Sequence, residues 1–483
     1  MSDTQPLPPV ALPSYDRSSL KPGIVHIGVG NFHRAHQAVY LDELFAMGLD
    51  HDWAIIGAGV RPSDAKMRDM LAAQNYLSTV IELEPGGPKA RRIGAMVDFL
   101  PVQADNAALI AAMTAPAIRI VSLTVTEGGY YVDPATGRFD PTHPDIAADG
   151  ARPQAPATAF GAIAAALRAR HAAGILPFGV MSCDNLPGNG AVTRDAVVGV
   201  ARLWDVALAD WIAANVAFPN GMVDRITPAT GPRERALAAK FGLDDPVPVT
   251  HETFRQWVLE DHFPAGRPAL EKVGVTFTDQ VHAFEVMKIR ILNGGHAIIA
   301  YPAALMDIDL VHEAMANPLV GGFLEKVERA EVLPHVPPVP GTNIPDYFTL
   351  IESRFANPQI ADTTRRLCFD GSNRQPKFIT PTIRDNRAAG NLPGGLILLS
   401  AFWCRYCAGV TDSGAEIADN DPRWPDLQAR SKAARTNPVE WLRMTEIYGD
   451  LAEDTAVVRA FAAALNAIWQ NGTAATLQAY LKS

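Results

Sequence analysis

The chain has 483 residues, of which 48% are hydrophobic and 19% are charged, and its formal net charge is -10. This composition is that of a globular protein, long enough to bury a large core in two or three domains. An acidic chain without a block of like charges lacks the concentrated basic patch that nucleic acid or an anionic membrane surface requires. Small molecules are therefore the expected partners.

The N-terminal segment MSDTQPLPPVALPSYDR has no basic stretch followed by an apolar one, the pattern of a secretory signal. The best candidate for a membrane span, LPGGLILLSAFWCRYCAGV, is interrupted by Arg405 and falls short of the ~20 apolar residues needed. We therefore expect a soluble, cytoplasmic protein.

The first chemical signal is a glycine turn. A short apolar run, residues 24–27, precedes Gly28 and Gly30, and a helix-like pattern follows. In dinucleotide-binding folds this order of strand, turn and helix lets the backbone approach a pyrophosphate at the helix N-terminus. His33 replaces the third glycine of G-x-G-x-x-G, so this match alone does not separate a nucleotide site from a plain turn.

The segment DWAIIGAGVRPSDAK predicts the second strand of the same unit, and Asp64 lies near its end. Such folds use an acidic side chain at this place to bind the ribose 2'-hydroxyl, and a carboxylate there repels a 2'-phosphate. Asp64 therefore favours NAD over NADP, although nearby Arg61 weakens the inference. The alternative is that Asp64 is a solvated loop carboxylate or a helix cap.

Two further strands are predicted in IRIVSLTVTEGGYY and LPFGVMSCDNLPGNG, with the helix TAFGAIAAALRARHAAG between them. Loops at the carboxyl ends of the strands form the ligand crevice of a doubly wound sheet. Thr126, Glu127, Asp184 and Asn185 are therefore site candidates by position.

From about residue 280 the chain changes to long apolar-periodic segments that are separated by polar or proline-rich loops. The predicted fold is an α/β Rossmann-type dinucleotide-binding domain over residues 1–280, followed by an all-α substrate-binding domain over residues 281–483.

Polar residues interrupt the apolar helix KIRILNGGHAII near the start of the second domain. At about 100° per residue, Lys288, Glu285, His296 and Asn293 fall near ~0°, ~60°, ~80° and ~140°, on one side of a helix. They could share a pocket. The spacing equally permits Lys288 to reach solvent while Asn293 and His296 are satisfied polar groups of the core.

Cys404 and Cys407 form a C-x-x-C pair, a spacing that occurs in zinc sites and redox pairs. No second pair or histidine partner stands at ligand spacing, and an isolated pair on an apolar helix is usually packing. We expect no bound metal.

Several motifs together resemble the polyol-specific long-chain dehydrogenases. They are IVHIGVGNFHRAH, SLTVTEGGYY, SCDNLPGNGAVTR, MVDRITP, FRQWVLED, GRPALEKVGVTFTDQV, MKIRILNGGHAIIAY and FDGSNRQPKF. The resemblance runs along essentially the whole chain and implies metal-independent, NAD-dependent oxidation of a sugar alcohol to a ketose, with D-mannitol and D-fructose as the favoured pair.

The resemblance also implies residue roles. Lys288 matches the general base, Asn185 and Asn293 match the asparagines that hold the reacting oxygen, and His296 matches the imidazole beside them. Glu285 matches a carboxylate that passes the proton towards solvent. The implied cofactor-binding residues are Gly28, Gly30, Asn31, Phe32, Arg61, Asp64, Thr126 and Glu127.

Asp224, Arg366 and Arg374 match positions that contact the polyol. Arg374 stands where the family pattern has a lysine. A guanidinium can bind two oxygen atoms at once, whereas an ammonium group is a point donor, so the two residues need not prefer the same polyol. The acidic pair that binds ribose is also incomplete, since Ser63 precedes Asp64.

These departures leave other substrates open. D-arabinitol or D-sorbitol oxidation, and reduction of fructuronate or tagaturonate, are alternatives within the family. A non-catalytic dinucleotide-binding protein is the alternative from another class. We expect a monomer or a weak oligomer.

Overall fold

The computed structural model describes residues 7–133 and 136–483. The chain divides into two compact units, Met1–His282 and Ala283–Ser483.

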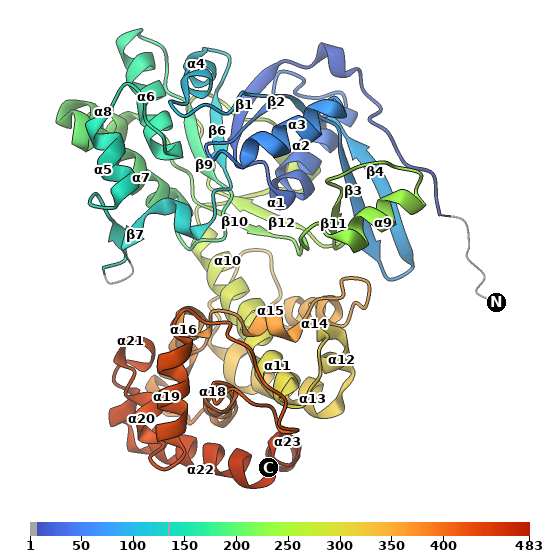
Figure 1. Cartoon of the computed structure of the whole chain (residues 1–483), viewed down its shortest axis with the longest axis vertical. Coiled ribbons are helices and arrows are strands. Elements are labelled where there is room, and N and C mark those ends of the chain that lie inside the picture. The colour runs from blue at the N-terminus through green and yellow to red at the C-terminus, as the bar shows by residue number, and fades with distance from the viewer. Residues whose placement is uncertain (1–6, 134–135) are drawn as a thin grey trace. The chain divides into compact units, whose positions relative to one another are not determined.

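A five-stranded sheet forms the centre of the first unit (Figure 1). Its order is β5-β2-β1-β6-β9, and every neighbouring pair is parallel. The strands are β1 Pro22–Ile27, β2 Ala54–Ala58, β5 Met96–Phe99, β6 Ile120–Leu123 and β9 Gly179–Ser182. The chain runs outwards from β1 in both directions, which is the doubly wound arrangement. The predicted α/β Rossmann-type class of this part is confirmed.

Helices lie between these strands in the chain and follow the last of them. They are α1 Asn31–Ala35, α2 Gln37–Ala46, α3 Asp64–Ala73, α4 Ala107–Thr114, α5 Pro144–Ala151, α6 Ala159–Ala172, α7 Asn189–Trp204, α8 Val206–Asn215 and α9 Pro232–Lys240, with short 3-10 turns η1 Arg17–Ser19, η2 Glu127–Tyr130 and η3 Leu270–Val273. The predicted helix between β6 and β9 is α6. It begins after Thr158, whose Oγ1 accepts the Gly161 N–H at 3.0 Å and so caps the first turn.

Alternating residues of the strands enter two separate cores. On β1, Ile24 packs with α2, whereas Val25 and Ile27 pack with α4, α6, α7 and α8. The pleat sends successive side chains to opposite faces, and helices cover both faces of a parallel sheet. The strands therefore appear in the sequence as continuous apolar runs.

Smaller sheets, which no sequence pattern indicated, complete the first unit. One sheet has the order β11-β3-β4, a second β10-β12-β13, and a third pairs β7 with β8. Their strands are β3 Ser78–Glu84, β4 Gly87–Ile93, β7 Val132–Asp133, β8 Arg138–Phe139, β10 Gly221–Asp224, β11 Val249–His251, β12 Gln256–Leu259 and β13 Thr276–Phe277. Most are two to four residues long, too short for an alternating pattern to identify.

The second unit is helical, as predicted, and its described residues show only isolated β-bridges. Its elements, with α10 crossing the boundary between the units, are α10 Val281–Met287, η4 Lys288–Asn293, α11 Gly294–Leu305, α12 Val311–Ala316, α13 Pro318–Val327, η5 Glu328–Val332, η6 Leu333–His335, α14 Ile344–Phe355, α15 Thr364–Cys368, α16 Gly371–Phe378, α17 Thr380–Ala388, α18 Gly394–Tyr406, α19 Trp424–Ala434, α20 Val439–Leu442, α21 Thr445–Tyr448, η7 Leu451–Glu453, α22 Thr455–Asn471 and α23 Thr473–Lys482. Helix α18 is buried along nearly its whole length and packs against α11 and α22, so it is the core of this unit.

Cys404 and Cys407 are buried in and just after α18, and neither forms a disulfide. Within residues 7–133 and 136–483, no three potential metal-ligating side chains of the His, Cys, Asp and Glu types cluster together. In the same residues, no helix has both the length and the apolar character needed to cross a bilayer.

Candidate active site

The two glycines after β1 have different structural roles. Gly28 has a φ of +95°, and a Cβ there would lie 2.2 Å from the carbonyl oxygen of Thr124. A Cβ on Gly30 would meet no atom within 4 Å. The fold therefore requires Gly28, whereas Gly30 leaves open space at the N-terminus of α1, where a dinucleotide backbone can approach.

His33 occupies the core beneath this turn. Its ring stacks on the ring of His26 at 3.5 Å between centroids. His26 in turn bonds to Ser122 Oγ at 2.8 Å and to Thr124 Oγ1 at 3.0 Å. Burial lowers the pKa of His26 to about 3 and lowers the pKa of His33 well below its usual value. A neutral histidine, stacked on the neutral His26 of β1, thus stands where the fingerprint has its third glycine.

The side chains of Asn31 and Phe32 are engaged within the protein. Asn31 Nδ2 donates to the carbonyl oxygen of Pro228 at 3.0 Å and to Thr230 Oγ1 at 2.9 Å. Phe32 stacks on His36 with 4.8 Å between ring centroids. A role of Asn31 in cofactor binding would therefore fall to its backbone N–H.

Asp64 lies beyond β2 and is the first residue of α3. Its Oδ2 accepts the Arg61 N–H at 3.0 Å, and Oδ1 is 3.6 Å from Arg61 Nη2. The carboxylate folds over Gly59, since a Cβ on that glycine would lie 2.3 Å from Asp64 Cβ. Asp64 thus follows the N-cap residue Ser63, binds the backbone N–H of Arg61, and keeps the exposed Arg61 guanidinium beside it.

Asp184 ties together the loops after β6 and β9. Its carboxylate accepts the N–H of Val125 at 2.9 Å, the N–H of Thr126 at 3.0 Å and the hydroxyl of Tyr130 at 2.7 Å. Burial raises its pKa, although these hydrogen bonds act in the opposite direction. Thr126 has a φ of +67°, a conformation that costs about 1–3 kcal/mol and persists only where neighbours fix it. Asp184 therefore sets the backbone of this loop.

The exposed Asn185 follows directly, and the exposed Glu127 lies on the other loop. Asn189, which sequence analysis missed, holds this region to β10. Its Nδ2 donates to the carbonyl oxygens of Asp184 at 3.1 Å and Gly221 at 2.8 Å, and its Oδ1 accepts the Gly221 N–H at 2.9 Å. Strand β10 ends at Asp224, which is buried.

In the second unit, the helix that carries Lys288 is not a regular α-helix. Residues Lys288–Asn293 form a π-helical turn, η4, between α10 and α11. A π-turn bonds residue i to residue i+5 and turns less per residue than an α-helix, so Asn293 lies closer in phase to Lys288 than the predicted ~140°. The regular geometry predicted for this segment was wrong, and the difference brings the two side chains nearer to one face.

The polar residues of this helix are not ordinary core groups. Lys288 and Glu285 are each only 6% exposed, so Lys288 does not extend into solvent. The amide oxygen of Asn293 is buried and has no hydrogen-bond partner among the described residues. A buried unsatisfied group of this kind costs about 1–3 kcal/mol and requires an explanation such as a catalytic role. The alternative of a satisfied core amide is therefore wrong for Asn293.

His296 stacks on Phe355 with 4.4 Å between ring centroids. Burial, together with the charges of Arg366, Arg354, Arg374 and Lys288, lowers its pKa well below the usual value. The imidazole is thus neutral, and it is surrounded by cations. Lys288, Arg366 and Arg374, which the sequence marked, are thus near enough to His296 to act on its charge. So is Arg354, a buried α14 residue that no sequence signal marked.

The two predicted arginines have different surroundings. The Arg366 guanidinium forks onto Asp362, with Nε to Oδ1 at 2.6 Å and a second bond from Nη2 to Oδ2. This carboxylate raises the pKa of Arg366. Arg374 is half-buried and donates to the carbonyl oxygen of Leu367 at 3.1 Å. Asp362 thus neutralises much of the charge that Arg366 would offer to an anionic substrate.

Because Gly295 has no side chain, Phe355 and Glu328 can pack closely against the helix at this position. A Cβ on it would lie 3.3 Å from the Phe355 ring and 3.4 Å from Glu328 Oε1. Glu328 begins a second π-turn, η5, and is completely buried. Burial, reinforced by the Glu352 carboxylate, raises the pKa of Glu328 well above its usual value. Burial therefore favours the protonated form of this carboxyl group.

Comparison with known proteins identifies the family. Residues 22–272 match the family model of the mannitol dehydrogenase Rossmann domain, and residues 280–469 match that of the mannitol dehydrogenase C-terminal domain. The chain belongs to the mannitol dehydrogenase family. It is 72% identical to the mannitol 2-dehydrogenase of Cereibacter sphaeroides over 472 residues, which cover 98% of this chain and 99% of that protein.

Solved structures of the family have the same fold. The mannitol 2-dehydrogenase of Pseudomonas fluorescens, in a ternary complex with NAD and D-mannitol, is 44% identical with a TM-score of 0.87, covering 99% of this chain and 97% of that chain. A D-sorbitol dehydrogenase in substrate-free form is 36% identical with a TM-score of 0.90, covering 98% of each chain. The resemblance to the polyol dehydrogenases is thus confirmed.

Proposed function

We propose that the chain catalyses the reversible, NAD-dependent oxidation of D-mannitol to D-fructose. The observation that carries this proposal is the 72% identity to a mannitol 2-dehydrogenase along 98% of the chain. The ternary complex of the Pseudomonas fluorescens relative, with its NAD and D-mannitol, supports the same cofactor and substrate.

Residues 1–280 are proposed as the dinucleotide-binding domain and residues 281–483 as the substrate-binding domain. The open space at Gly30 fits a dinucleotide, because backbone N–H groups at the start of α1 can meet its phosphates. Asp64 is proposed to bind the ribose, and Thr126 and Glu127 contribute from the loop after β6. NAD supplies the hydride acceptor.

Lys288 is proposed as the general base that removes the proton of the reacting hydroxyl. Its burial disfavours the ammonium form, and the neutral amine is the form that can accept this proton. Glu285, three residues earlier and also buried, is proposed to pass the proton on. This chemistry uses side chains only, so we propose that no metal is required.

Asn293 and Asn185 are proposed to hold the substrate oxygen, since amide N–H groups stabilise the negative charge that develops on it. The neutral His296 is proposed to orient the substrate by a hydrogen bond. Asp224, Arg366 and Arg374 remain the proposed polyol contacts. A cytoplasmic location and a monomeric or weakly oligomeric state remain predictions from the sequence.

The test is a steady-state assay of NADH oxidation with D-fructose in the presence of a chelator. We expect turnover that the chelator does not reduce and that NADPH supports poorly. Parallel assays with D-xylulose, fructuronate and tagaturonate test the other ketone substrates. Oxidation of D-mannitol and D-sorbitol by NAD is compared as well, because both polyols give D-fructose when they are oxidised at C2. A higher kcat/KM with another ketone than with D-fructose, or with D-sorbitol than with D-mannitol, would move the assignment to that substrate, and inactivity with D-fructose and with every alternative would contradict the proposal.

A further inference from the structure

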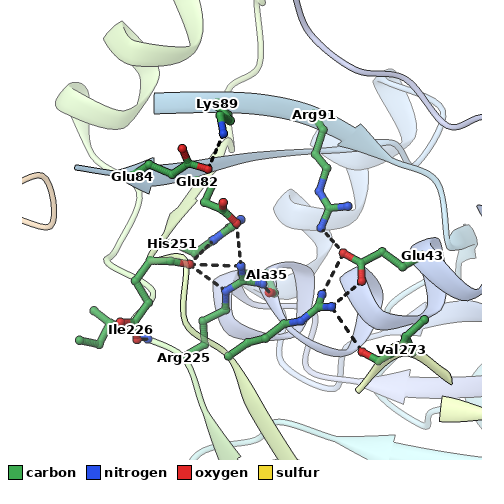
Figure 2. A network of polar contacts seen from close by, with 12 residues as sticks. Ala35, Glu43, Glu82, Glu84, Lys89, Arg91, Arg225, Ile226, His251 and Val273 are labelled. Atoms are coloured by element: carbon green, nitrogen blue, oxygen red, sulfur yellow. Dashed lines mark hydrogen bonds and ion pairs between the residues drawn. The ribbon is translucent and has the colours of Figure 1, made fainter. Parts of the chain in front are cut away.

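Arg225 follows Asp224 at the end of β10, and its side chain is only 1% exposed. Its guanidinium makes a set of bonds to backbone carbonyl groups, which Figure 2 shows. Nη1 donates to the carbonyl oxygen of Ala35 at 2.6 Å, and Nε and Nη2 both donate to that of Glu252 at 3.2 Å. Nη2 also lies 3.4 Å from Glu82 Oε2. The residue after a proposed polyol contact is thus fixed in several directions at once.

Ala35 is the last residue of α1, and the N-terminus of this helix follows the glycine turn. The other end of α1 contacts the same loop, because Asn31 Nδ2 donates to Pro228 and Thr230. A helix of five residues is about 7.5 Å long, so it moves as one piece. The segment 225–230 therefore holds α1 at both of its ends.

The far side of the network is equally constrained. Glu252, whose carbonyl oxygen binds Arg225, accepts the Ile226 N–H with Oε1 at 2.6 Å, and its own N–H donates to the carbonyl oxygen of Ile226 at 3.1 Å.

Two other arginines near Arg225 bind a different carboxylate. Glu43, nearby in Figure 2, binds Arg91 and Arg255, both at 2.9 Å. Arg225 alone among these three arginines bonds to α1. Burial lowers its pKa to about 10, so the guanidinium keeps its charge at neutral pH.

On the basis of the proposed function, we propose that Arg225 is a positioning residue that couples cofactor binding at the glycine turn to polyol binding at Asp224. Occupation of the turn by NAD or NADH fixes α1, and the bond from Arg225 to Ala35 carries that constraint to the adjacent Asp224. The coupling is reciprocal, because a polyol that orders Asp224 must tighten cofactor binding by the same factor.

The test uses NADH, whose fluorescence reports binding, with and without saturating D-mannitol, which forms a complex that cannot turn over. In the wild type we expect D-mannitol to lower the Kd of NADH at least about fivefold, within the usual range of such couplings. In Arg225→Met the ratio of the two Kd values should approach one. The same variant should raise the KM for D-mannitol more than it lowers kcat.

Arg170→Met is the matched control. Arg170 is also a buried arginine of the first unit, and it donates to the carbonyl oxygens of Met113 at 2.9 Å and Leu176 at 2.7 Å, with no bond to α1 or β10. This variant should lose stability yet keep the wild-type ratio. Arg225→Lys retains the charge and can reach one carbonyl group, so it should restore part of the coupling. If Arg225→Met does not fold, the ratio of the two Kd values is measured on Arg225→Lys.

A wild-type ratio that persists in both Arg225 variants would overturn the inference, as would an equal loss in Arg170→Met. If the wild-type protein oxidises D-mannitol but has the same Kd for NADH with and without D-mannitol, the coupling is overturned and the proposed function is not. Absence of D-mannitol oxidation by the wild type would overturn the proposed function, and the coupling with it.

Discussion

Replacing Glu328 by glutamine should make the stability of the protein depend less on pH. Glu328 is fully buried, neither carboxyl oxygen has a hydrogen-bond partner in the described residues, and its pKa is raised well above the ordinary value of 4.5. Above that value the unfolded chain releases this proton, whereas the folded chain keeps it. The folded state thus binds more protons, and the free energy of unfolding falls by about 1.4 kcal/mol per pH unit up to the raised pKa.

Glutamine has nearly the same shape and no proton to lose. We therefore expect Glu328→Gln to gain about 1.4 kcal/mol relative to the wild type between pH 5 and pH 6. Urea unfolding, followed by tryptophan fluorescence at both pH values, measures this difference. Glu416→Gln, a change of an exposed carboxylate, is the control and should show no such gain. An equal difference between wild type and Glu328→Gln at the two pH values would refute the reasoning, because Glu328 would then be ionised in the folded protein.

Three further predictions concern the cofactor site and the base. Lys288→Ala should lower kcat by about 10²–10⁴, the usual contribution of a general base, and leave the Kd of NADH within about threefold; an unchanged kcat would contradict the assigned role. Asp64→Ala removes a carboxylate and frees Arg61 for a 2'-phosphate, so the ratio of kcat/KM with NAD to that with NADP should fall at least about tenfold in parallel assays. His33 is neutral when folded but takes up a proton below about pH 6.5 when unfolded, so its contribution to stability is lost as the pH falls. The stability advantage of the wild type over His33→Gln in urea unfolding should shrink by up to about 1.4 kcal/mol from pH 6.5 to 5.5, and a constant difference would show that His33 titrates normally.

Much of the first unit could be predicted because its signals are local. The run before Gly28 is buried on both faces of the sheet, so it is continuously apolar, and the glycines mark the turn directly. The loops after β6 and β9 were located by the rule that ligands bind at the carboxyl ends of parallel strands. The bonds that Asp184 makes to Val125 and Thr126 could not be predicted, since they join segments distant in sequence.

The residues that were missed are mostly buried polar groups. Arg225, Arg354 and Asn189 have no distinguishing pattern, because a charged or amide residue between apolar neighbours usually indicates a solvated position. Their partners are in several cases backbone carbonyl groups, which every residue carries, so the sequence does not indicate which ones are reached. The π-turn could not be predicted for a different reason: a regular α-helix turns by a constant ~100° per residue, and the chain departs from that geometry between Lys288 and Asn293.

The π-turn η4 makes the length of this segment matter more than its composition. A π-turn holds one residue more than the α-helical turn it replaces, so the extra residue is absorbed within the turn. If the same residues formed a regular α-helix, Asn293 would lie near ~140° from Lys288. Inserting a further residue that the turn does not absorb would rotate Asn293 and His296 by another ~100°, whereas deleting one would leave a regular α-helix with Asn293 near ~40°. Apolar exchanges within the same stretch leave the phase unchanged. Across relatives, we therefore expect this segment to vary in its side chains, and any form that is one residue shorter to be a regular α-helix.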